Sequence, residues 1–76
     1  MAKAYLKIDV EPGKEKTVKG ALLKIKGVSS AELTAGEQDV IVLVEQKSYE
    51  DILKLVVNKV RKVPGIVGTV TNLILD

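Results

Sequence analysis

The sequence contains no cysteine and no histidine. Without thiols and imidazoles the chain cannot form disulfides, zinc sites built on those ligands, or active sites that need a cysteine nucleophile or a histidine base. It also lacks tryptophan and phenylalanine, and its only aromatic residues are Tyr5 and Tyr49. A module that stacks RNA bases on an open sheet face needs more aromatic side chains than these. We therefore expect neither a common type of enzyme nor a base-stacking RNA-binding module.

The sequence also has little excess of positive over negative charge, and it has no long apolar segment. Twelve Lys and Arg residues against ten Asp and Glu residues leave a formal net charge of +2, which indicates no basic surface for nucleic acid. A membrane-spanning helix needs about 18 or more apolar residues in a row, and no segment approaches that length. The first residues also lack the apolar core of a signal peptide. We expect a cytoplasmic protein with no direct contact to nucleic acid or membrane.

The chain is short. Its 76 residues, 46% of them apolar, are enough for one compact domain and too few for two. A domain of this size has a small core and little net stability. Since disulfides and sites with Cys or His ligands are excluded, we expect oligomerisation to add stability. We expect a single domain over residues 1–76, with no catalytic residue, no cofactor and no metal.

Periodic patterns of apolar residues predict six elements. Alternation with period two predicts strands, and one-sided helical spacing predicts helices. The expected strands are residues 4–10, 28–34, 40–44 and 66–75, and the expected helices are 14–27 and 48–63. Ser48 is the predicted N-cap of the second helix. The apolar stripe that we expect this helix to bury is Tyr49, Ile52, Leu53, Val56, Val60 and Val63.

An internal repeat favours one arrangement of these elements. Residues 24–28 (Lys-Ile-Lys-Gly-Val) recur as residues 62–66 (Lys-Val-Pro-Gly-Ile), and Val10-Glu11 recurs as Val44-Glu45. Two successive βαβ units give the order βαββαβ. We therefore predict a ferredoxin-like α+β fold, in which a four-stranded antiparallel sheet carries two helices on one face.

The third predicted strand is apolar at every position from 40 to 44. A sheet with one solvated face does not require this pattern, so both faces of the strand are expected to be covered. If the even-numbered valines face the helices, Ile41 and Leu43 lie on the helix-free face. We expect this face to pair with a second copy, sheet against sheet, as a dimeric α+β barrel. The alternative is that the chain's own terminus shields Ile41 and Leu43.

Several short motifs follow one another in a recognisable order. They are Glu11-Pro12-Gly13-Lys14, Gly27-Val28, Gly36-Glu37-Gln38-Asp39, Val63-Pro64-Gly65-Ile66 and Thr69-Val70-Thr71. In this order and spacing the sequence resembles the effector-binding, oligomerising (RAM) domain of the Lrp/AsnC family of prokaryotic transcriptional regulators. The resemblance covers nearly the whole chain, which looks like a stand-alone domain without the family's DNA-binding helix-turn-helix.

The resemblance implies dimers formed through the sheets, a tetramer of dimers (an octamer), and an amino-acid pocket where dimers meet. In the family, the Gly-x-x-Asp loop lines that pocket, and polar residues of the last strand also contribute to it. By position, the residues implied here are Gly36, Glu37, Gln38, Asp39, Thr69 and Thr71. The family frequently has a tyrosine before the aspartate, where this sequence has Gln38.

These residue types suit a free amino acid. Asp39 can pair with an ammonium group, and backbone N–H groups around Gly36 can bind a carboxylate. Thr69 and Thr71 are two apart on a strand, so their hydroxyls project from one face. Each residue also has a simpler explanation. Gly36 suits a hairpin that needs positive φ, Asp39 can bond its own loop, and threonine favours strands.

We therefore expect a non-enzymatic module that binds an amino acid and regulates by ligand-dependent assembly. Its partners are further copies of the chain or a full-length Lrp/AsnC regulator with the same interface. A structural oligomerisation partner that binds no ligand is the alternative. A small dimeric α+β-barrel enzyme is a third possibility, which the absence of histidine and cysteine disfavours.

Overall fold

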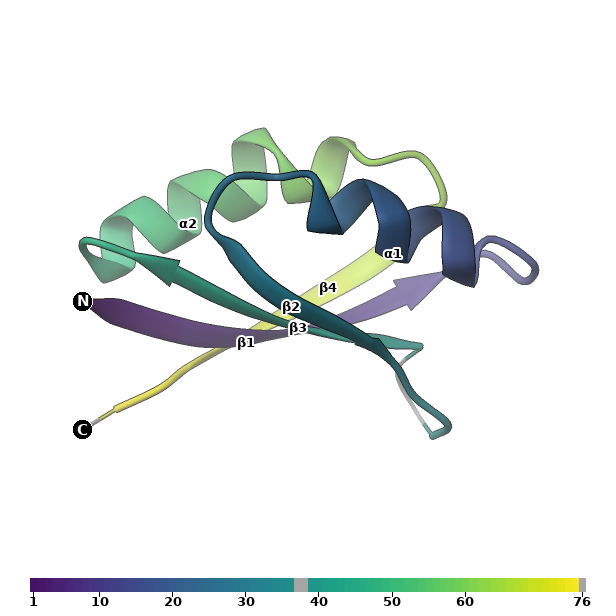
Figure 1. Cartoon of the computed structure of the whole chain (residues 1–76), viewed down its shortest axis with the longest axis horizontal. Helices are drawn as coiled ribbons and strands as arrows, with labels where there is room; N and C mark the ends of the chain where they lie inside the picture. Colours follow the sequence, from purple (N-terminus) through teal and green to yellow (C-terminus); the bar gives the residue numbers. More distant parts are fainter. Residues whose placement is uncertain (37–38, 76) are drawn as a thin grey trace.

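The computed structural model describes residues 1–36 and 39–75, and it has the predicted order βαββαβ. The elements are β1 (Ala2–Val10), α1 (Glu15–Leu23), β2 (Val28–Leu33), β3 (Val40–Gln46), α2 (Tyr49–Asn58), the short 3-10 helix η1 (Val60–Lys62) and β4 (Ile66–Leu73). The strands form one antiparallel sheet in the order β2-β3-β1-β4. Both helices cover the same face of this sheet (Figure 1). The predicted ferredoxin-like α+β fold is confirmed.

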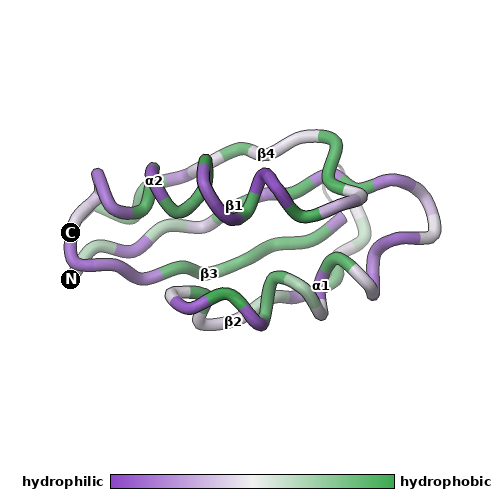
Figure 2. The backbone as a smooth tube through the Cα atoms, turned by 90° about the horizontal axis from the view of Figure 1, so that it is seen from above, coloured by the Kyte–Doolittle hydropathy of each residue, from purple (hydrophilic) through white to green (hydrophobic). Residues whose placement is uncertain are grey.

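The hydrophobic core fills the space between the sheet and the helices. Every even-numbered residue of β1 is buried, and so are the even-numbered valines of β3. The helices contribute the buried side chains of Val18, Leu22, Ile52 and Val56, and η1 contributes Val60. Seen from above, α1 lies toward the β2 edge and α2 toward the β1 and β4 side (Figure 2). No helix in the described part of the chain is long and apolar enough to cross a membrane.

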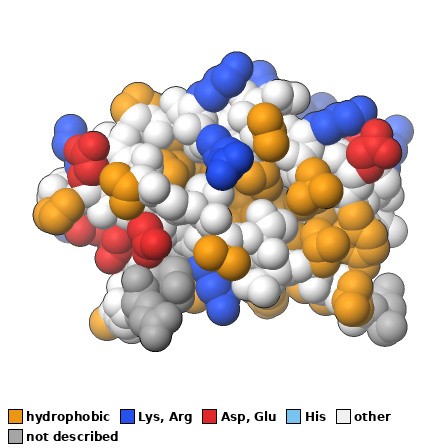
Figure 3. Space-filling view, turned by 180° about the vertical axis from the view of Figure 1, so that it is seen from behind, with side chains coloured by type: hydrophobic (Ala, Val, Ile, Leu, Met, Phe, Trp, Pro, Cys, Tyr) orange, Lys and Arg blue, Asp and Glu red, His pale blue; other side chains and the backbone are white. Residues whose placement is uncertain are grey.

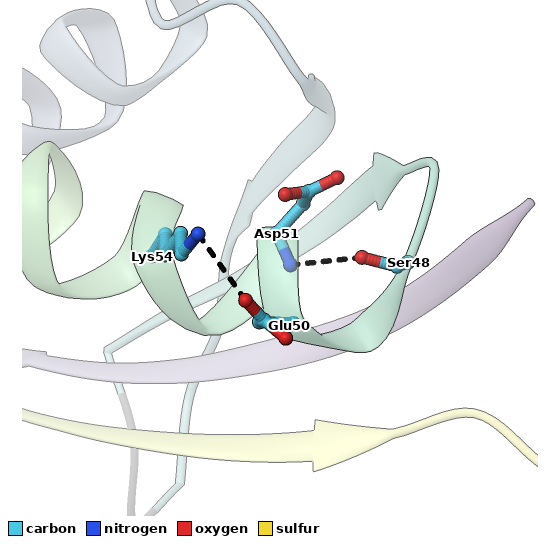
Figure 4. A network of polar contacts seen from close by, with 4 residues as sticks. All are labelled: Ser48, Glu50, Asp51 and Lys54. Atoms are coloured by element: carbon cyan, nitrogen blue, oxygen red, sulfur yellow. Dashed lines mark hydrogen bonds and ion pairs between the residues drawn. The ribbon is translucent and has the colours of Figure 1, made fainter.

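The start of α2 follows the prediction closely. The hydroxyl oxygen of Ser48 accepts a hydrogen bond from the Asp51 N–H at 3.1 Å, which is the interaction expected of an N-cap. Glu50 and Asp51 lie in the first turn, where the helix dipole favours negative charge. The Lys54 ammonium lies 3.2 Å from Glu50 Oε1, one turn away (Figure 4).

Both helices are shorter than the sequence pattern predicts. α1 ends at Leu23 rather than near Gly27, and α2 ends at Asn58 because the backbone of Lys59 leaves the helical region (φ −122°). The chain then continues as η1, which directs Val60 into the core. The predicted buried stripe is also too wide: Tyr49 and Leu53 are 37% and 50% exposed.

Backbone hydrogen bonds join the two halves of the internal repeat in equivalent places. The Gly65 carbonyl accepts the Glu11 N–H at 2.8 Å, and the Gly27 carbonyl accepts the Glu45 N–H at 2.9 Å. Each glycine therefore binds a residue at the end of the first strand of the other half: Glu11 directly follows β1, and Glu45 is the penultimate residue of β3. Both glycines have positive φ, +105° for Gly27 and +98° for Gly65, a conformation that glycine adopts without a steric cost.

Candidate functional site

The helix-free face of the sheet is the first candidate for a functional surface. Residues paired across antiparallel strands project from the same face. Tyr5 is paired with Leu43 and Lys7 with Ile41, and on the other side of β1 Lys7 is paired with Val70. Because the alternate residues of β1 and β3 are buried beneath the helices, these five side chains lie on the helix-free face.

We call Tyr5, Ile41, Leu43 and Val70 the sheet patch. Ile41 and Leu43 are half-buried within the protomer, whereas Tyr5 and Val70 are 47% and 51% exposed. The predicted orientation of β3 is therefore correct. Neighbouring strands shield Ile41 and Leu43 in part, but the helices lie on the opposite side of the sheet (Figure 1). The sheet patch thus consists of apolar side chains next to Lys7, on a face that the helical layer does not cover.

Asp39 lies at the start of β3 and holds the hairpin to β1. One carboxylate oxygen, Oδ2, accepts the Val10 N–H at 3.0 Å. Its own N–H donates to the Ile8 carbonyl at 3.1 Å, and its carbonyl accepts the Thr34 N–H at 2.9 Å. The side chain thus bonds β1 rather than its own loop. Its other oxygen, Oδ1, accepts no hydrogen bond from the described residues.

The rest of the predicted hairpin site is only partly described. Gly36 is exposed and has a φ of +147°, which agrees with the simpler explanation that this turn needs glycine. Glu37 and Gln38 lie outside the described residues. The segment that follows β2 runs to the side of the sheet away from the helices (Figure 1).

Thr69 and Thr71 share a face, but it is the face that carries the helices. Thr69 is paired with Ile8 and Thr71 with Leu6, and both partners belong to the buried core. The threonines remain half-buried because β4 is an edge strand. One protomer therefore does not bring them to the face on which the hairpin segment projects.

The structure adds a residue that the sequence patterns do not single out. Arg61, the only arginine of the chain, lines a hollow of about 110 Å³ together with Ile66, Val67, Gly68 and Thr69. A guanidinium group forms paired hydrogen bonds with carboxylates. No sequence motif points to Arg61, and only the path of η1 beside β4 reveals its neighbours.

These features define a class of protein: a small α+β domain with two helices on one sheet face and an apolar patch on the other. A family model described as the Lrp/AsnC ligand binding domain matches residues 3–76. The chain belongs to this family.

The similar proteins include both longer regulators and small separate proteins. An uncharacterised HTH-type transcriptional regulator from Pyrococcus furiosus, PF0250, is 35% identical over 57 residues, which are 75% of this chain and 38% of that protein. The chain thus spans well under half of the length of this relative. The crystal structure of the hypothetical protein PHS023 from Pyrococcus horikoshii is 33% identical, with a TM-score of 0.91. That alignment covers 99% of this chain and 90% of the other.

A more distant structure carries a named ligand. The transcriptional regulator NMB0573 from Neisseria meningitidis was solved as a complex with L-Met. Its TM-score to this chain is 0.85 over 99% of this chain and 50% of that protein, at 14% identity. At this identity the likeness establishes the common fold.

Proposed function

We propose that the protein is a cytoplasmic, non-enzymatic module of transcriptional regulation that assembles through its sheets and binds an amino acid between subunits. The observation that carries this proposal is the sheet patch on the helix-free face. An apolar surface of this kind on a small domain favours association, and the Lrp/AsnC relatives that match are regulators.

Assembly is the first part of the proposal. Leu43 lies on β3, at the β3 side of the sheet patch, and is paired with Tyr5 of β1. We expect the native chain to form dimers or larger assemblies by light scattering, and Leu43→Lys to shift it to monomers, because the new charge is buried in the interface without a partner. Leu53→Lys is the matched control, since Leu53 is exposed on α2. Loss of assembly in the control variant alone would place the interface on the helices instead.

Ligand binding is the second part. Asp39 Oδ1, which accepts no hydrogen bond from the described residues, suits an ammonium group, and Arg61 beside Thr69 suits a carboxylate. A single protomer does not bring the hairpin with Asp39 together with the β4 edge that carries Thr69. We therefore propose that the ligand bridges the hairpin of one subunit and the β4 edge of another. The L-Met complex of the distant structural neighbour supports an amino acid as the ligand class.

Calorimetric titration with all twenty amino acids tests this part. We expect heat with at least one amino acid, and its loss in Asp39→Asn. The asparagine oxygen can still accept the Val10 N–H, so this variant removes the charge and keeps the structural bond. Heat that persists unchanged in Asp39→Asn and Arg61→Gln would exclude the proposed site.

A structural partner without a ligand remains the second candidate function, and it is favoured by the bonds that already engage Asp39. In this case no amino acid gives heat, assembly is unchanged by ligand, and the chain still pairs with itself or with a full-length regulator. Light scattering with and without amino acids separates the two functions.

A further inference from the structure

A groove on the helical layer has chemistry that the sheet patch and hairpin do not use. Its cavity, of about 340 Å³, is lined by Lys24, Ile25, Lys26, Leu55 and Lys59. We call it the lysine groove. It lies between α2 and the turn that follows α1, two segments that are separate in the view from above (Figure 2). An adjoining hollow of about 240 Å³ shares Leu55 and Lys59 and continues along α2 past Asn58.

The lysine groove concentrates positive charge: none of its lining residues is acidic, and the acid that lines the adjoining hollow, Asp51, is accompanied there by Lys54. Within the described residues, no ion pair involves Lys24, Lys26 or Lys59. Lys24 and Lys59 are the C-cap residues of the two helices, so helix dipoles account for part of their placement. Lys26 has no such explanation, because it lies in the turn beyond α1. Three like charges around one hollow create a local field that attracts anions.

The floor of the groove is aliphatic. Ile25 and Leu55 are half-buried and pack against the core, so each presents a fixed apolar surface between the lysines. The groove has no arginine and no aromatic residue among its lining side chains. Lysine acts as a flexible point charge and does not impose the paired geometry with which arginine selects a particular anion.

We propose that the lysine groove docks an acidic segment of a partner protein, in which carboxylates flank an apolar side chain. The carboxylates meet Lys24, Lys26 and Lys59, and the apolar side chain covers Ile25 and Leu55. This arrangement matches the usual interface plan of an apolar centre with a charged rim. Because the helices and the sheet patch lie on opposite sides of the sheet (Figure 1), the groove remains open in a sheet-to-sheet dimer.

Fluorescence anisotropy with a labelled synthetic peptide tests the proposal. The probe carries single leucines flanked by glutamates, and the control peptide carries glutamines instead of the glutamates. We expect the acidic peptide alone to bind, with an affinity that falls as salt is added. The triple variant Lys24→Glu/Lys26→Glu/Lys59→Glu should weaken binding at least about tenfold. The matching variant with glutamines at these positions should give a smaller loss.

A matched triple variant separates the groove from general charge. Lys14, Lys16 and Lys62 are exposed and do not line the groove, and changing them to glutamate alters the net charge equally. We expect this variant to bind nearly as well as the native chain. Equal loss in both triple variants, or no binding of the acidic peptide, would overturn the proposal. Displacement of the peptide by inorganic phosphate at matched ionic strength would also overturn it, in favour of a small anion.

Discussion

At the scale of single residues, Asp39 contributes to the stability of the fold and is also part of the proposed binding site. Its carboxylate takes the place of a backbone acceptor for the Val10 N–H, just before β3 begins. A carboxylate in this role forms a charge-assisted hydrogen bond. The same side chain therefore fixes the end of β1, and we propose that it also binds the ligand through its second oxygen, so the structural role and the proposed binding role must be measured separately.

We expect Asp39→Ala to lower the free energy of unfolding by about 1–3 kcal/mol, because a partly buried N–H loses its acceptor. Asp39→Asn should cost less than half of this, since the amide oxygen restores the bond. Urea denaturation of the two variants measures the difference. Equal loss in both variants would mean that the negative charge, rather than the hydrogen bond, supplies the stability.

Single residues are also where sequence reasoning was least complete. The pattern singled out Asp39, but its partner Val10 is 29 positions away, and only the register of the sheet brings the two together. The orientation of Thr69 and Thr71 was likewise undetermined. β4 is an edge strand whose burial does not alternate regularly, so its sequence carries little information about which face each residue occupies.

At the scale of elements, the sequence predicted more. β1 alternates because the helices cover one of its faces, β3 is apolar on both faces from 40 to 44, and the positions of both strands agree with the structure. The predicted end of the second helix was wrong because the lysines and β-branched valines between 59 and 63 allow either a helix or a 3-10 turn. The choice depends on Val60 reaching the core, which is a tertiary contact.

The helix α1 contains a site where a substitution should stabilise it. Gly20 is exposed, has helical neighbours on both sides, and has open space where a Cβ would lie. Gly20→Ala should raise the free energy of unfolding by about 0.5–1 kcal/mol, because glycine loses more backbone entropy in a helix. Chemical denaturation checks this.

Gly65→Ala is the contrasting control for that measurement. Gly65 has a φ of +98°, and its added Cβ would lie 3.1 Å from a methyl group of Val18. This variant should lose stability through backbone strain and crowding. If both alanine variants changed stability in the same direction, the conformational explanation would fail.

At the scale of the whole molecule, the two faces differ in chemistry. The helical layer carries most of the Lys and Arg side chains visible from behind, and exposed hydrophobic side chains gather toward one end of this view (Figure 3). The opposite side of the sheet carries the sheet patch. A domain with a core this small gains stability when such a patch is covered, so its measured stability should depend on assembly.

This dependence gives a prediction for the native chain. Association binds the folded state and leaves the unfolded state unbound, so Tm should rise with protein concentration. For a dimer of chains of this size, a tenfold increase in concentration should raise Tm by about 3–5 °C. Differential scanning calorimetry over a concentration series measures the slope. Leu43→Lys should melt at a lower Tm that does not change with concentration, and the Leu53→Lys control should keep the native slope. A native Tm that stayed constant while Leu43→Lys matched it would mean that the sheet patch is stable in water and that the chain folds without a partner.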